Sequence, residues 1–368
     1  MRASATRMAG RHASGQTRPI RLLIVDDSAV ARAVFTRMIA ARREFDIAAT
    51  VSSADAALAF LSADWVDIIL LDIEMPGIDG LTALPDLLAA SSGARVLIVS
   101  SSAEEGAAAT MRALTLGAAD TLAKPGVGAF GGRFADILAE KLMRIGHARS
   151  PQRMPAASFE AAPDASIELR PLSSGPVACV AIGASTGGLH ALSEFLRALP
   201  DEFVAPILIT QHLPPVFMSF FAAQIEEISG RPTRVAHEGA PLIPGGIVVA
   251  PGEGHLGVEI VRGEPVARII KGPMESGCMP SVDPMFEAVA AVFGCDGVGV
   301  ILSGMGRDGT IGARSLVMAG SDVLLQNRET SVVWGMPGSA AASGAGSAIM
   351  PPAQLAELIV RRARLAAQ

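Results

Sequence analysis

Cysteine and aromatic residues are scarce in this sequence. Its 368 residues contain three cysteines, Cys179, Cys278 and Cys295, whose odd number and spacing favour neither a disulfide framework nor a metal site. We expect free thiols in a reducing compartment and assign them no function. Aromatic residues make up only 4% of the chain and apolar residues 50%, a composition typical of α/β proteins with strands rich in Val, Ile and Leu.

Basic charge and long apolar runs are also lacking. The 30 basic and 36 acidic residues give a formal net charge of −6, which disfavours nucleic acid as a partner. No apolar run approaches the roughly 18 residues of a membrane helix, so we expect no membrane insertion. Residues 1–19 carry four arginines and no acid but lack the apolar segment of a secretory signal. We predict that they form a disordered extension of a cytoplasmic protein.

The chain length favours two domains, because a single hydrophobic core rarely grows this large. Over residues 20–146, five short β-rich runs alternate with helical patterns, which predicts a parallel sheet with helices on both faces. Residues 147–175 are rich in Pro, Ala and Ser and predict a flexible linker. Residues 176–368 form a second α/β block, for which we expect a doubly wound, mainly parallel sheet.

Polar residues end four of the β-rich runs in the first block. Asp26 and Asp27 end the first run and Asp72 the third, and three carboxylates at one edge of a parallel sheet suit Mg²⁺. Ser100 and Lys124 end the fourth and fifth runs and supply a hydroxyl and a cation for a phosphoryl group. One such Asp alone would more often be a helix cap, but five residues together predict a phosphoryl site.

These residues and the "DIEMPGIDG" loop resemble the receiver domain of bacterial response regulators. The resemblance implies a flavodoxin-like (βα)5 fold and phosphorylation of Asp72 by a histidine kinase. It also implies Mg²⁺ on Asp27 and Asp72, with Asp26 assisting through water. Ser100 and Lys124 would then sense the acyl phosphate.

The second block opens with "CVAIGASTGG", which places Ser185 among glycines at a strand-to-helix junction. This stretch fits the GxSxG nucleophile elbow, in which the helix N-terminus also offers donors to an oxyanion. A phosphate-binding turn and a plain tight turn remain alternatives.

A serine nucleophile needs a base, and His212 ends the run that we expect beside the strand of Ser185. His190 sits on the following helix and is more simply a solvated or packed side chain. His237 and His255 remain candidates for substrate contact.

The third member of a triad would be Asp308 in the glycine-rich "SGMGRDG" loop, although one Asp-Gly pair is more often a turn. Asp283 and Asp322 are competitors. The order Ser, His, Asp differs from that of α/β-hydrolases, so we do not expect the ordinary hydrolase fold.

The motifs "IGASTGG", "QHLPP", "VAPGEGHLGV", "PSVDPMF", "SGMGRDG" and "WGMPGSA" resemble the catalytic domain of the CheB family of chemotaxis protein-glutamate methylesterases. The resemblance implies Ser185 as nucleophile, His212 as base and Asp308 as orienting acid, without a cofactor. It also implies substrate or oxyanion contacts by Thr186 and the backbone near Met305.

The family resemblance implies methylated chemoreceptors as substrates, methanol release, and deamidation of receptor glutamines as a second activity. It further implies that the unphosphorylated receiver covers the site. Two residues depart from the family pattern: Met279 replaces a basic residue before "PSVD", and Ser303 replaces a threonine. A phosphorylation-controlled adaptor without catalysis, and a methylesterase of another signalling system, remain alternative functions.

Overall fold

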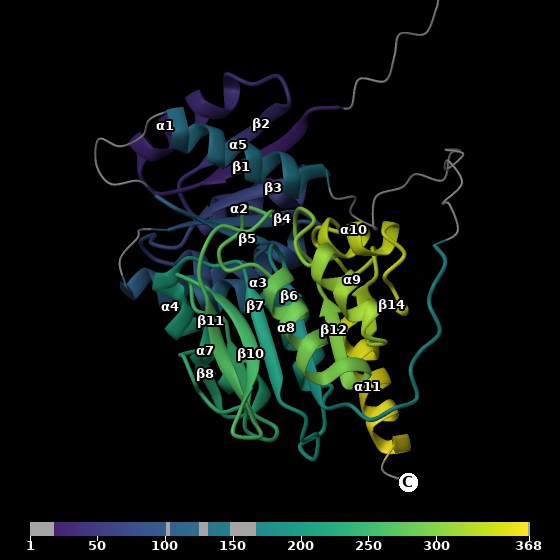
Figure 1. Cartoon of the computed structure of the whole chain (residues 1–368). Helices are drawn as coiled ribbons and strands as arrows, with labels where there is room; N and C mark the ends of the chain where they lie inside the picture. The colour runs from purple at the N-terminus through teal and green to yellow at the C-terminus, as the bar shows by residue number, and fades with distance from the viewer. Residues whose placement is uncertain (1–17, 101–103, 125–131, 148–166, 367–368) are drawn as a thin grey trace, which may run out of the picture.

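The computed structural model describes residues 18–100, 104–124, 132–147 and 167–366, which form two parallel sheets flanked by helices and one separate ribbon (Figure 1). The elements of the N-terminal half are β1 (Ile20–Val25), α1 (Ala29–Ala40), β2 (Phe45–Val51), α2 (Ala54–Ala63), β3 (Ile68–Asp72), α3 (Gly80–Ala90), β4 (Arg95–Ser100), α4 (Glu104–Thr115), β5 (Asp120–Ala123) and α5 (Gly132–His147).

The N-terminal sheet has the strand order β2-β1-β3-β4-β5, with every pair parallel. This order is that of flavodoxin-like folds. Helices α1 and α5 cover one face, and α2, α3 and α4 cover the other. Gly80 is required where α3 begins, because a Cβ there would lie 2.0 Å from the Asp72 carbonyl oxygen. The glycine of the "DIEMPGIDG" loop therefore brings α3 close to the end of β3.

The C-terminal half contains a seven-stranded parallel sheet in the order β14-β13-β12-β6-β7-β9-β8. Its elements are β6 (Cys179–Ala184), α6 (Gly188–Arg197), β7 (Ile207–Gln211), η1 (Pro215–Phe217), α7 (Met218–Ser229), β8 (Thr233–Val235), β9 (Ile247–Val249), β10 (His255–Val261), β11 (Glu264–Ile270), α8 (Asp283–Phe293), η2 (Gly294–Asp296), β12 (Gly297–Ile301), α9 (Thr310–Met318), β13 (Asp322–Gln326), α10 (Met336–Ala342), β14 (Ala348–Met350) and α11 (Pro352–Ala366).

Strand β6 is the centre of this sheet. The chain runs from β6 outward to β7 and beyond, then returns on the other side of β6 through β12. The order of the strands therefore reverses between β6 and β12, and such a switch point opens a crevice beyond the carboxyl ends of the strands. Helices α6, α7 and α11 pack on one face and α8, α9 and α10 on the other.

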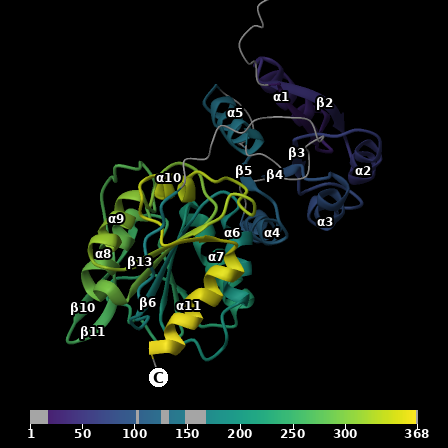
Figure 2. The same ribbon diagram turned by 90° about the vertical axis from the view of Figure 1, so that its right-hand side faces the viewer.

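The two halves are in contact (Figure 2). Helix α4 lies against α6, η1 and α7, and its Met111 and Leu114 share one buried apolar cluster with Leu189 and Met218. A backbone hydrogen bond of 2.8 Å from Gly187 N to Ala119 O joins the two chain segments directly. The N-terminal half therefore sits at the edge of the C-terminal sheet where α6 begins.

The predicted α/β class and the parallel sheets are confirmed. Sequence reasoning missed β8, which has three residues, and β11, which pairs antiparallel with β10 in a ribbon outside the main sheet. The extension at 1–19 and the linker at 147–175 lie largely outside the described residues, and the domain boundaries stay predictions. Among the described helices, none combines the length and hydropathy needed to cross a bilayer.

Candidate active site and phosphoryl site

Ser185 lies in the turn between β6 and α6, at the switch point of the sheet. Its N–H donates to Ser303 O at 3.0 Å, and its carbonyl accepts from Gly188 N at 2.7 Å and from Gln211 Nε2 at 2.9 Å. Gly187, with φ of +74°, ends the turn, and a Cβ there would lie 2.5 Å from the Val332 side chain. The turn is thus fixed on both sides, and the Ser185 side chain lines a cavity.

His212 and Asp308 meet beside this turn. His212 directly follows β7, and its Nε2 lies 2.7 Å from Asp308 Oδ2. Asp308 comes from the loop after β12 and is only 1% exposed. The structure therefore brings all three residues of the predicted triad to one edge of the sheet. Among the described residues, however, no hydrogen bond joins the Ser185 hydroxyl to His212.

The Asp308 carboxylate is held by the segment before α8. Ser281 Oγ donates to Oδ1 at 2.6 Å, and Val282 N donates to Oδ2 at 2.7 Å. Behind this segment, His255 Nδ1 accepts from Ser281 N at 2.9 Å, and its Nε2 donates to Gly272 O at 2.8 Å. These donors fix the rotation of the carboxylate and aim one oxygen at His212.

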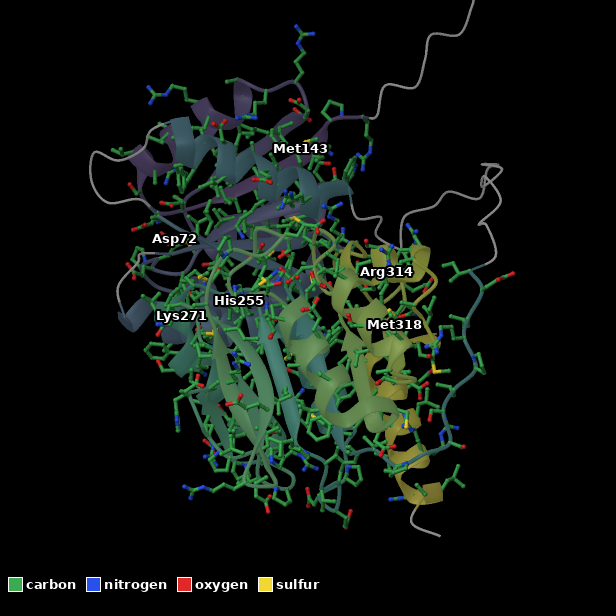
Figure 3. The ribbon with its side chains drawn as sticks, viewed as in Figure 1. Asp72, Met143, His255, Lys271, Arg314 and Met318 are labelled. Atoms are coloured by element: carbon green, nitrogen blue, oxygen red, sulfur yellow. The ribbon has the colours of Figure 1, made fainter. Side chains whose placement is uncertain are left out.

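His255 is fully buried at the carboxyl edge of the sheet (Figure 3). Substrate contact, for which the sequence left His255 a candidate, is therefore excluded in this arrangement. Its role is to hold the backbone at Ser281. His190 is half exposed and lies 3.5 Å from Glu194 on its own helix, which agrees with a solvated side chain.

The competing aspartates have other partners. Asp322 is paired with Arg362 at 2.8 Å and accepts from Ser173 N, so it fastens the segment before β6 to the domain. Asp283 accepts from Gly312 N at 2.8 Å, and burial together with nearby Asp308 raises its pKa to about 7. Within the described structure, Asp308 is the carboxylate hydrogen-bonded to His212.

Cys278 is a residue of this site that sequence reasoning missed. One ligand atom each of His212, Cys278 and Asp308 lies within 4.8 Å of the other two, and the Cys278 side chain lines the same cavity as Ser185. The available signal was its place two residues before the "PSVD" motif, which supplies Ser281 to the site.

The charges of the site are coupled. Burial disfavours the imidazolium, but the hydrogen bond to Asp308 and the Cys278 side chain together raise the pKa of His212 to about 9. Burial alone would raise the pKa of Asp308, yet its bonds to His212, Ser281 and Val282 hold that pKa below its usual range. The raised pKa favours the imidazolium, and a base must lose its proton before it can activate an alcohol.

Both halves of the chain line the cavity over Ser185, which has a volume of about 240 Å³. Leu114, Ala118 and Asp120 contribute from the N-terminal half. Asp120 accepts from Thr186 Oγ1 at 3.0 Å and pairs with Lys141 at 2.7 Å. Thr186, predicted as a substrate contact, is thus engaged by the N-terminal half. Met305 also lines the cavity, and its sulfur accepts a hydrogen bond from the Arg144 guanidinium.

A second site lies in the N-terminal half at the carboxyl ends of its strands. Asp26, Asp27 and Asp72 place one oxygen each within 4.8 Å of the others. Lys124 Nζ lies 2.6 Å from Asp72 and 3.0 Å from Asp26. Asp26 and Asp72 are buried, whereas Asp27 is exposed. Ser100 ends β4 as expected, but its side chain lies outside the described part of the structure.

Burial raises the pKa of Asp72, although Lys124 acts in the opposite direction. For Lys124, burial lowers the pKa, but the bonds to Asp72 and Asp26 outweigh it and the pKa is raised. Figure 3 shows Asp72 well above the C-terminal sheet, so the two sites are separate. Three carboxylates with an exposed member leave room for water, which fits the ligands that Mg²⁺ prefers.

The fold and the two sites define a receiver domain joined to an α/β enzyme domain. Comparison with protein families identifies a response regulator receiver domain over residues 22–128 and a CheB methylesterase domain over residues 180–359. The chain belongs to the CheB methylesterase family.

Curated relatives match nearly the full length. A protein-glutamate methylesterase/protein-glutamine glutaminase 2 of Caulobacter vibrioides is 43% identical, covering 94% of this chain and 99% of the relative. Proteins named protein-glutamate methylesterase/protein-glutamine glutaminase 1 are each 37% identical. That of Paramagnetospirillum magneticum covers 95% of this chain and 98% of the relative, and that of Rhodospirillum rubrum covers 94% and 95%.

The support of Asp308 generates a first prediction. Ser281→Ala removes the hydroxyl that donates to Asp308 Oδ1. The loss of this donor to a buried carboxylate oxygen should lower the free energy of unfolding by about 1–3 kcal/mol. It should also reduce kcat for ester hydrolysis, because Asp308 can rotate away from His212. Thermal unfolding and initial rates measure the two effects.

Ser321→Ala is the matched control, since this buried hydroxyl donates to Gly294 O far from Asp308. It should lose stability without a loss of kcat. An equal loss of kcat in both variants would show that Ser281 acts only through stability.

Proposed function

We propose that this protein is a phosphorylation-regulated methylesterase that hydrolyses glutamate γ-methyl esters on chemoreceptors in the cytoplasm. The observation that carries the proposal is the 2.7 Å contact of His212 with buried Asp308 beside the Ser185 turn. The names of the relatives support the same activity and add the deamidation of glutamine.

In the proposed reaction, His212 takes the Ser185 proton as the Ser185 oxygen attacks the ester carbonyl. The tetrahedral intermediate collapses, the carbon–oxygen bond to the methoxy group breaks, and His212 returns the proton so that methanol leaves. Water, activated by His212, then cleaves the acyl-enzyme to free glutamate and Ser185. A glutamine side chain follows the same path with ammonia as the leaving group.

Each neighbour has a role in this scheme. Asp308 keeps His212 in one orientation and stabilises the imidazolium formed during attack. Thr186 and the backbone at Met305 are the proposed oxyanion contacts, and the nearby N-terminus of α6 favours negative charge. In the described arrangement Gly187 N donates to Ala119 O and Gly188 N to Ser185 O.

The receiver site supports regulation by phosphorylation. Asp72 is the proposed acceptor of phosphate from a histidine kinase, with Lys124 and Ser100 sensing the modified group. Asp27 and Asp72, assisted by Asp26, would hold Mg²⁺, which when bound neutralises charge on the phosphoryl oxygens. Lys124 now bridges Asp26 and Asp72, so adding phosphate to Asp72 must change its partners.

The described arrangement supports autoinhibition. Helix α4 and the start of β5 cover the cavity, and Asp120 occupies the Thr186 hydroxyl that a substrate would need. Because the two halves belong to one chain, a modest interface suffices to keep the cavity covered. Phosphorylation at Asp72 would then open the site by weakening this interface.

The identity of the nucleophile is tested with Ser185→Ala. The variant should lose up to ~10⁶ in turnover, by analogy with serine proteases, when methanol release from methylated receptor membranes is measured. Ser193→Ala is the control, because this buried hydroxyl of α6 donates to Leu189 O of its own helix. If Ser185→Ala keeps most of its activity, another group attacks the ester. The Cys278 thiol, which lies beside His212, would then be the alternative nucleophile.

The phosphorylation site is tested with Asp72→Asn. A small-molecule phosphodonor should raise methanol release by the wild-type protein but not by this variant, because an amide cannot form the acyl phosphate. Asp86→Asn, at an exposed position of α3, should respond like the wild-type protein. Activation of Asp72→Asn to the wild-type level would refute the assignment.

The covering contact is tested with Asp120→Asn in the full chain without phosphodonor. Loss of the charge weakens the bonds to Thr186 and Lys141, and a charged hydrogen bond contributes about 1.5–3 kcal/mol. Basal methanol release should therefore rise several-fold. Asp136→Asn, which removes an exposed partner of Arg42, is the control and should not change the rate. An unchanged rate for Asp120→Asn would argue against this contact as a lock.

A further inference from the structure

A thiol, an imidazole and a carboxylate converge in the cavity of the C-terminal half. Cys278, His212 and Asp308 come from three separate chain segments, and one ligand atom of each lies within 4.8 Å of the others. Cys278 and His212 are partly exposed and line the cavity of about 240 Å³, so an ion could reach both. The triad uses His212 and Asp308, but nothing in the proposed reaction uses Cys278.

The donor set is that of a borderline-soft divalent cation. Zn²⁺ prefers cysteine sulfur and histidine nitrogen in tetrahedral geometry, whereas Mg²⁺ prefers oxygen ligands and water. The sulfur and the imidazole would supply two ligands, and water can complete the coordination from the open side of the cavity.

Asp308 is already committed to other bonds. Its two oxygens accept from Ser281 Oγ, Val282 N and His212 Nε2 at 2.6–2.7 Å. It therefore serves better as the acceptor behind the histidine than as a ligand. A carboxylate that orients an imidazole through one ring nitrogen is the usual support of a zinc-bound histidine, whose other nitrogen holds the metal.

The lysine in the cavity lining is already paired with a carboxylate. Lys141 contributes to the same cavity, but its ammonium pairs with Asp120 at 2.7 Å. Met279, the residue after Cys278, adds no charge. A dication in the cavity would therefore be repelled less by Lys141 than by an unpaired lysine.

We propose that Cys278 and His212 form an inhibitory Zn²⁺ site, with Asp308 orienting His212 toward the metal. Binding displaces the protons of the Cys278 thiol and of the His212 imidazolium, because only the thiolate and the neutral imidazole coordinate. A histidine whose lone pair is bound to zinc cannot take the proton of Ser185. The inhibitory consequence rests on the proposed esterase function, whereas metal binding itself does not.

Binding is measured first with Co²⁺ on the full-length protein in excess Mg²⁺, which occupies oxygen sites. The wild-type protein should show a thiolate-to-cobalt charge-transfer band that one equivalent of Zn²⁺ abolishes. Cys278→Ser should lose this band. Cys295→Ser, which removes the exposed thiol beside Asp296, should keep it. A band that survives in Cys278→Ser but disappears in Cys295→Ser would overturn the proposal.

Inhibition is measured by methanol release, each protein being normalised to its own zinc-free rate. Removal of Cys278 should raise the half-inhibitory Zn²⁺ concentration by about tenfold or more, since even weaker perturbations of zinc sites change affinity by this factor. Addition of EDTA should restore the rate of the wild-type protein. Equal sensitivity of wild-type protein and Cys278→Ser would refute inhibition through this site.

A measurement on the wild-type protein avoids dependence on how the variants fold. Zn²⁺ should slow the reaction of Cys278 with iodoacetamide, followed by peptide mass mapping, and should leave the labelling of Cys295 unchanged. An unprotected Cys278 would contradict the proposal. If the protein releases no methanol at all, the proposed function fails, but the cobalt and protection measurements still decide whether the metal site exists.

Discussion

The enzyme half depends on keeping one carboxylate charged away from water. Asp308 is almost fully buried, and an isolated buried carboxylate would either take up a proton or destabilise the fold. Here Ser281, Val282 and His212 supply three short hydrogen bonds that keep it ionised. The same bonds that make the burial tolerable also determine the direction in which His212 points. The geometry of the base and the stability of the loop are therefore inseparable, and His255 belongs to this structure although it lies outside the cavity.

One short strand contributes both to the receiver site and to the contact between the two halves of the chain. Strand β5 is only four residues long. Asp120 begins it and contacts Thr186 of the enzyme half, while Lys124 follows its other end and bridges Asp72 and Asp26. Lys124 and Asp120 therefore lie at opposite ends of one short strand, and the Asp120 end touches the active-site turn. In the proposed regulation, β5 is thus the element that connects the phosphoryl site to the cavity.

Much of this arrangement could be predicted from the sequence because it follows from local pattern and from the geometry of parallel sheets. The runs of β3 and β6 are buried throughout, and the polar residue at the end of each run must lie at the carboxyl edge. That argument brings Ser185 and His212 together without any knowledge of distance, whereas Asp308, seven residues beyond the end of β12, is assigned through the family resemblance. It cannot predict contacts that depend on how separate segments dock. The bond from Ser281 to Asp308 joins two loops, and the bond from Thr186 to Asp120 joins two halves. Nothing in the spacing of three cysteines indicates that Cys278 lies beside the base.

The two side-chain clusters that could hold a cation differ in the chemistry of their donor atoms. The receiver cluster offers carboxylate oxygens, of which Asp27 faces solvent, whereas the enzyme cluster offers the sulfur of Cys278 and a nitrogen of His212. Hard cations that keep their water shell prefer the first kind of donor set, and borderline-soft cations that exchange water for sulfur and nitrogen prefer the second. The proposed Mg²⁺ and Zn²⁺ sites would therefore differ in the cation that each prefers. In the proposed scheme, the first cation would act on the transfer of phosphate, and the second would act on the proton that the esterase reaction must move.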